Sequence, residues 1–129
     1  MDNITNYTKD KFLGGKIVIY QPLNGFRTSI DSIFLSSAVN LKKGNSVLEL
    51  GCGVGTILCC LKNREKNISI CGVEVQKKYA QFARVNLKEN NFDGEIYNSN
   101  IKNLPYKISK KGFDHVIFNP PYLKSDILL

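Results

Sequence analysis

The chain has 129 residues, the length of one domain of ordinary size. Apolar residues make up 43% and charged residues 22%, a globular composition that excludes an intrinsically disordered chain. The net charge is +7, from 18 Lys and Arg against 11 Asp and Glu, which favours a polyanionic partner such as RNA. Lys, Asn and Ile make up about a third of the chain, so a compositional bias is the alternative source of this charge.

The sequence shows no sign of a membrane segment, a signal peptide or a metal site. No apolar stretch approaches the ~20 residues that a membrane span needs, and the first residues lack the basic and apolar regions of a signal peptide. We therefore expect a cytoplasmic protein. The cysteines Cys52, Cys59, Cys60 and Cys71 form no C-x-x-C pair, and the single His115 is far away in sequence. This spacing predicts buried, reduced thiols and no bound metal.

In chain order, the first eleven residues are polar, and we expect them to be frayed. The β-branched run at residues 16–20 predicts a strand. Thr28 stands three residues before Asp31, the spacing of a capping box at the start of a helix. The basic residues and the glycine at 42–44 would end that helix.

From residue 46 onward, short apolar strands alternate with helical stretches. The predicted strands cover residues 46–50, 68–74, 95–98 and 113–118. The predicted helices cover residues 56–63 and 76–90, and residues 102–112 form a polar connection. Alternation of this kind predicts an α/β fold with a parallel sheet and right-handed crossovers.

A glycine loop, Gly51-x-Gly53-x-Gly55, joins the first of these strands to its helix. Glycines let the backbone turn sharply and approach a ligand, and a helix N-terminus offers unpaired N–H groups. The spacing differs from a dinucleotide fingerprint, which places its last glycine at the position of Thr56. An acid before the loop, here Glu49, is typical of sites for S-adenosylmethionine. The alternative is a glycine turn that only packs the helix on the strand.

Glu74 lies 23 residues after Gly51, at the predicted end of the next strand. A carboxylate at this place can accept both hydrogen bonds of a ribose diol. The alternative is a solvated carboxylate at a strand end.

Asn119-Pro120-Pro121-Tyr122 follows the last predicted strand, and two prolines require the chain to leave the sheet there. The Asn119 side-chain oxygen and the Pro120 carbonyl can accept both hydrogens of an exocyclic amine and so aim its lone pair at a methyl sulfonium. Tyr122 can stack on a flat base. Positioning of this kind needs no strong general base. The alternative is a Pro-Pro turn without a site.

Together, residues 47–55, 72–76 and 119–122 resemble the Rossmann-like S-adenosylmethionine-dependent N-methyltransferases, whose members act on adenine, cytosine, guanine or protein glutamine. The segments 12–16, 21–22, 25–27 and 31–35 are similar to the bacterial enzymes that N6-methylate an anticodon-loop adenine of valine tRNA. The likeness runs from about residue 8 to Tyr122. It implies a cofactor-binding half at residues 45–122, an amino-terminal addition at 1–44 and a tail at 123–129.

The resemblance also implies roles for matched positions. Asn119, Pro120, Pro121 and Tyr122 would form the catalytic motif that holds the adenine. Glu74 would bind the ribose hydroxyls. Arg27 and Asp31 would lie at the pocket mouth, with a surface arginine and a helix cap as the alternatives. The implied cofactor contacts are Glu49, Gly51, Cys52, Gly53, Gly55, Glu74, Val75, Asn100, Ile101 and Asn119.

The chain departs from the family pattern in two ways. Asn100 stands where the family has an acid that accepts from the cofactor adenine, and an uncharged acceptor forms weaker hydrogen bonds. The chain also stops seven residues after Tyr122, so we expect strands five to seven of the family fold to be missing and residues 113–118 to form an exposed edge. Three alternatives follow for this edge. Another chain completes the sheet, two copies pair, or the chain is a non-catalytic remnant that binds cofactor or a partner. Ribosomal RNA and protein glutamine are the alternative substrates to tRNA.

Overall fold

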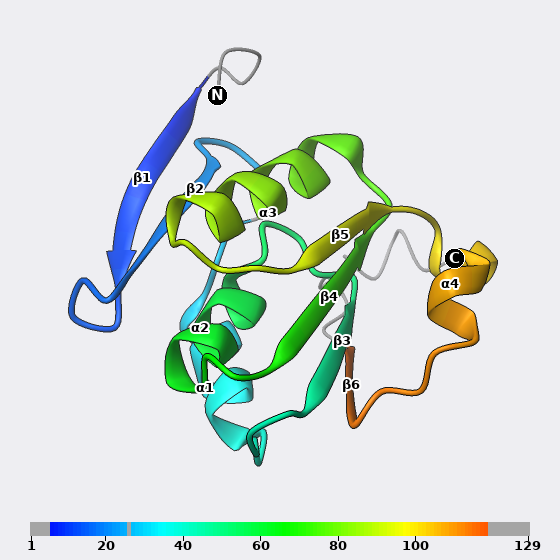
Figure 1. Ribbon diagram of the computed structural model, residues 1–129. Helices are drawn as coiled ribbons and strands as arrows, with labels where there is room; N and C mark the ends of the chain where they lie inside the picture. Colours follow the sequence, from blue (N-terminus) through cyan, green and yellow to red (C-terminus); the bar gives the residue numbers. More distant parts are fainter. Residues whose placement is uncertain (1–5, 26, 119–129) are drawn as a thin grey trace.

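The computed structural model of the chain describes residues 6–25 and 27–118. Its centre is a four-stranded sheet in the order β5-β4-β3-β6, and every pair in it is parallel. The strands are β3 (Ser46–Leu50), β4 (Ser69–Glu74), β5 (Glu95–Asn98) and β6 (His115–Phe118). This confirms the predicted α/β fold with a parallel sheet (Figure 1).

Helices cover both faces of the sheet (Figure 1). The helical elements are α1 (Ile30–Ala38), α2 (Thr56–Arg64), α3 (Lys77–Glu89), the 3-10 helix η1 (Ile101–Asn103) and α4 (Tyr106–Ser109). Because side chains alternate along a strand, neighbouring residues of β3 enter different cores. Val47 packs in the core with α2 and α3, whereas Leu48 packs in a smaller core with Ile108 of α4. The short helices η1 and α4 occupy the segment predicted as a polar connection.

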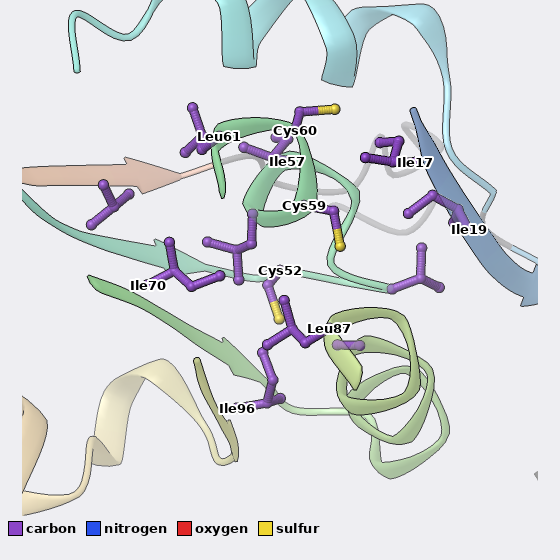
Figure 2. Close-up of a cluster of buried hydrophobic side chains, with 14 of the residues drawn as sticks. Ile17, Ile19, Cys52, Ile57, Cys59, Cys60, Leu61, Ile70, Leu87 and Ile96 are labelled. Carbon is purple, nitrogen blue, oxygen red and sulfur yellow. The ribbon is translucent and has the colours of Figure 1, made fainter. Parts of the chain in front are cut away.

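The larger core lies between the sheet, α2 and α3 and reaches the amino-terminal strands (Figure 2). It contains Cys52, Cys59 and Cys60, while Cys71 belongs to the smaller core. All four thiols are free and buried, which confirms the predicted burial of the cysteines. Among the described residues, every helix is too short or too polar to serve as a transmembrane span.

Ahead of the sheet, an antiparallel hairpin pairs β1 (Tyr7–Phe12) with β2 (Ile17–Pro22). The strand at residues 16–20 was predicted, but the expectation that residues up to 11 are frayed is wrong from Tyr7 onward. β2 is fixed by Ile17 and Ile19, both 0% exposed, and β1 pairs with it along its whole length. β1 alternates exposed and half-buried residues, so its polar composition concealed a strand.

Helix α1 is shorter than predicted and lacks the expected capping box. Its N-cap is Ser29, which forms no side-chain cap bond, and the Thr28 hydroxyl pairs with that of Thr56. The helix ends at Ala38, ahead of the basic residues at 42–44. Its carboxyl end is bound by Arg64 of α2, whose guanidinium donates to the carbonyls of Ser37 and Val39.

Strand β6 lies at the edge of the described sheet, where it pairs only with β3. Ile117 is buried, while Val116 and Phe118 are 59% and 54% exposed. An apolar edge of this kind can accept a further strand.

Candidate functional site

The glycine loop takes the conformation that its sequence predicts. Gly51, Gly53 and Gly55 have φ values of 74°, 56° and 87°, a left-handed region that other residues rarely adopt. Gly55 is the N-cap of α2 and lies so close to α3 that a Cβ there would be 3.3 Å from the Cα and Cβ of Ala83. The loop therefore needs glycine both for its turn and for its packing.

Hydrogen bonds fasten the loop to the end of β4. The Val73 carbonyl accepts from the backbone N–H groups of Gly51 and Cys52, at 2.8 and 3.0 Å. The Glu74 carboxylate accepts from Gly53 N at 3.0 Å through Oε1 and from Gln76 N at 2.8 Å through Oε2. Glu74 thus lies where the loop, β4 and the start of α3 meet, as its place in the sequence predicts.

A cavity of about 270 Å³ opens at this carboxyl end of the sheet. Its polar side chains include Glu74, Gln76 and Asn100, and its apolar rim includes Val75 and Ile101, which are 61% and 42% exposed. The lining residues are Gly51, Gly53, Val73, Glu74, Val75, Gln76, Tyr79, Asn100, Ile101 and Phe118. Parallel α/β sheets bind their ligands at this edge.

The structure therefore brings together six of the predicted cofactor residues: Gly51, Gly53, Glu74, Val75, Asn100 and Ile101. Asn100 also caps η1, since its Oδ1 accepts from Lys102 N at 2.9 Å. An amide oxygen has two lone pairs, so one remains for a ligand.

The other predicted cofactor residues of this region, Glu49, Cys52 and Gly55, are not among those that line the cavity. Glu49 is 1% exposed, and its Oε1 is the only buried side-chain polar atom of the described residues that has no hydrogen-bond partner. Burial and, to a smaller extent, the negative charge of Glu74 raise the pKa of Glu49 well above its ordinary value. Burial followed by the charges of Glu49 and Glu74 likewise raises the pKa of the Cys52 thiol.

Neither of the two residues predicted at the pocket mouth, Arg27 and Asp31, is among the residues that line the cavity. Arg27 donates to the Pro22 carbonyl at 2.6 Å and to Asp10 Oδ2 at 3.2 Å, which ties it to the hairpin. Asp31 is exposed in the first turn of α1. Asn119, Pro120, Pro121 and Tyr122 lie outside the described residues.

Sequence reasoning missed four residues that line the cavity: Val73, Gln76, Tyr79 and Phe118. Gln76 and Phe118 carried a usable signal, because they stand two residues after Glu74 and directly before Asn119. Tyr79 lies within the predicted helix at 76–90, and only the tertiary structure shows that it reaches the cavity.

Comparison with known proteins identifies the family. The family model of the methyltransferase small domain matches residues 27–126. A tRNA1(Val) (adenine(37)-N6)-methyltransferase of Pseudoalteromonas translucida is 32% identical over 102 residues, which cover 78% of this chain and 43% of that protein. The ribosomal RNA small subunit methyltransferase C of Haemophilus influenzae is 36% identical over 90 residues, covering 70% of this chain and 26% of that protein.

Among solved structures, the tRNA (uracil-54, C5)-methyltransferase of Pyrococcus abyssi, in complex with S-adenosyl-L-homocysteine, shares the fold. Its TM-score is 0.71 at 23% identity, and the match covers 91% of this chain and 29% of that one. The chain thus spans less than half the length of each of these relatives. With the parallel sheet, the glycine loop and a family match over 100 residues, the chain belongs to the methyltransferase small domain family.

Proposed function

We propose that the cavity binds S-adenosylmethionine and that the chain carries the cofactor-binding part of an RNA adenine-N6 methyltransferase. The observation that carries this proposal is the position of Glu74. Its carboxylate is fixed to the glycine loop and to the start of α3, and it lines the cavity at the carboxyl end of β4. A carboxylate held in this way is suited to accept hydrogen bonds from a ribose diol.

The residues present fit this cofactor. Each Glu74 oxygen accepts one backbone hydrogen bond and keeps further acceptor capacity for a hydroxyl group. Val75 and Ile101 offer exposed apolar surface for a flat base, with the Asn100 amide beside them. Among the described residues, the buried Oε1 of Glu49 has no hydrogen-bond partner, so it can still bond the cofactor that the family resemblance assigns to Glu49.

The bound cofactor would supply a methyl group on a cationic sulfur, which an amine can attack. The chain itself would bind and orient the amine. We propose that Asn119 and the Pro120 carbonyl accept its two hydrogens, that Pro121 turns the chain out of the sheet and that Tyr122 stacks on the base. This assignment rests on the motif and on its place directly after Phe118, which lines the cavity.

We propose tRNA as the substrate because residues throughout this chain match a relative named for tRNA1(Val) adenine. The relative named for ribosomal RNA favours a second candidate, an rRNA methyltransferase. The net charge of +7 suits both. Four free cysteines fit a reducing compartment, and we propose the cytoplasm.

The exposed edge of β6 is a place where a further strand could pair with the sheet. Val116 and Phe118 present apolar side chains there, and we propose that another chain adds a strand to this edge and completes the substrate groove.

The test is transfer of a labelled methyl group to tRNA and ribosomal RNA transcripts, assayed with the chain alone and with cell extract added. We expect label in an adenine of tRNA when the chain is assayed with extract, above the level given by extract alone. Asn119→Ala should retain cofactor binding and lose transfer. Transfer by Asn119→Ala would refute the role given to Asn119, and label in ribosomal RNA alone would favour the second candidate.

A further inference from the structure

The outer face of the β1–β2 hairpin carries cationic and aromatic side chains together. Alternate residues of β1, namely Tyr7, Lys9 and Lys11, are exposed. The strand register places Lys9 opposite Tyr20 and Lys11 opposite Val18. Since residues two apart share a face, these five side chains lie on one surface.

Charge is segregated between the two faces of the hairpin. Its one carboxylate, that of Asp10, belongs to the opposite face and accepts from Thr8 at 2.6 Å, from Gln21 at 2.8 Å and from Arg27 at 3.2 Å. Of the ion pairs found among the described residues, none involves Lys9 or Lys11. The outer face therefore presents positive charge without a compensating acid on the hairpin.

The two tyrosines form a small aromatic platform on this face. The ring centroids of Tyr7 and Tyr20 are 5.8 Å apart, with an angle of 49° between the rings. Lys9 Nζ lies 5.6 Å from the centroid of Tyr20. Tyr7 is 42% exposed, so its ring is accessible to a ligand.

The hairpin leads toward the cavity. β2 ends at Pro22, and the loop that follows approaches α3, because a Cβ at Gly25 would lie 2.7 Å from the Tyr79 hydroxyl. Tyr79 lines the cavity. A chain bound along the outer face would therefore extend toward the cavity.

We propose that this face, formed by Tyr7, Lys9, Lys11 and Tyr20, binds a single-stranded segment of the RNA substrate. The inference deepens the proposed function and rests on it. The positive charges of lysines can neutralise phosphates, and exposed tyrosine rings can stack on unpaired bases. In a duplex the bases stack on one another and are not accessible to an aromatic side chain, so the aromatic platform favours a single strand.

The experiment measures binding of a fluorescein-labelled 12-nucleotide oligouridylate to the full chain by anisotropy, at several salt concentrations. Lys9→Gln/Lys11→Gln should reduce the slope of log K against log salt by about 1.4, because each phosphate contact of a single strand contributes roughly 0.7. Tyr20→Leu keeps apolar bulk and should weaken binding by about fivefold or more through loss of one stacked base.

The matched control is Lys42→Gln/Lys43→Gln, which removes the same charge from an exposed site outside the hairpin. We expect its slope to stay within about 0.3 of the wild-type value. An equal decrease in both double variants would show that only net charge matters and would overturn the inference. Tighter binding of a duplex of the same length would overturn it as well.

Binding of S-adenosylhomocysteine by the same variants separates this inference from the proposed function. We expect wild-type affinity in all of them, since none of the substituted residues lines the cavity. If the hairpin substitutions leave RNA binding unchanged while cofactor binding is intact, the proposal of the hairpin surface is refuted and the proposed function is not. Absence of cofactor binding in the wild-type chain refutes the proposed function.

Discussion

The side-chain amide of Asn86 hydrogen-bonds both backbone groups of Tyr20, a residue 66 positions earlier in the chain. Its Oδ1 accepts from Tyr20 N at 2.7 Å, and its Nδ2 donates to Tyr20 O at 2.9 Å and to Val54 O at 2.7 Å. One turn later, at the C-cap of α3, Asn90 makes the same pair of bonds with Val18, at 2.9 and 2.7 Å. The two asparagines thus pair with backbone groups of β2, and of the two only Asn86 also bonds the glycine loop, through Val54.

This difference gives a matched pair of variants. Asn86→Ala should lower the free energy of unfolding by about 3 kcal/mol, because it leaves buried backbone groups without partners. Asn90→Ala should cost about 1–2 kcal/mol, since Asn90 is only partly buried. We expect S-adenosylhomocysteine to bind Asn86→Ala more weakly than Asn90→Ala at a temperature where both are folded. Equal affinities in calorimetry would show that the bond to Val54 does not position the loop.

Gly55 and Gly44 form a second matched pair. Their φ values are 87° and 84°, but a Cβ at Gly44 would have no neighbour within 4 Å, whereas one at Gly55 would meet Ala83. Gly44→Ala should therefore cost about 1 kcal/mol from backbone strain alone. Gly55→Ala should cost about 1–3 kcal/mol more through overpacking against α3. Urea unfolding measures both, and equal costs would mean that α3 yields to the added methyl group.

Asp10 should contribute an acid-dependent part of the stability of the hairpin. Hydrogen bonds from Gln21 and then Thr8 lower the pKa of its carboxyl, and the Arg27 charge adds to this effect. A carboxyl whose pKa is lowered by folding stabilises the protein above its unfolded pKa of about 3.9, and this contribution is lost as the pH falls through the folded pKa. The stability difference between wild type and Asp10→Asn should shrink on acidification from pH 6. A difference that stays constant down to pH 2 would contradict the hydrogen-bond network.

The four cysteines should resist thiol reagents in the folded protein. Cys59 is 0% exposed, and burial raises the pKa of Cys71 to about 11, so the reactive thiolate is scarce at pH 8. We expect Ellman's reagent to detect four thiols in urea and to react slowly with the native chain. Fast reaction of a thiol under native conditions would reveal local opening of the core that contains it.

Local patterns predicted the part of the molecule that holds the site. The strand at 46–50, the glycine loop and Glu74 follow one another along a short stretch, and each has its own chemical signature. Gly51, Gly53 and Glu74 line one cavity, because the carboxyl ends of neighbouring parallel strands share an edge of the sheet.

The features that sequence reasoning missed depend on distant partners. β1 carries too few apolar residues to be recognised as a strand, and its pairing with β2 defines it. In the sequence, Asn86 looks like an ordinary polar residue of a helix. Its hydrogen-bond partners Tyr20 and Val54 are distant in the chain, so no local pattern marks it. Thr28 was expected to cap α1, but its hydroxyl pairs with Thr56 instead. These strand and hydrogen-bond partners are determined by tertiary contacts, which a local sequence pattern does not contain.

The most direct test of the account is calorimetric titration of S-adenosylhomocysteine into the 129-residue chain and its Glu74→Ala variant. We expect micromolar binding by the wild type and a loss of roughly 10- to 150-fold in the variant, since charge-assisted hydrogen bonds contribute about 1.5–3 kcal/mol. Circular dichroism of both proteins confirms that they are folded. No binding by the folded wild type, or equal binding by Glu74→Ala, would contradict the claim that this cavity is a cofactor site built around Glu74.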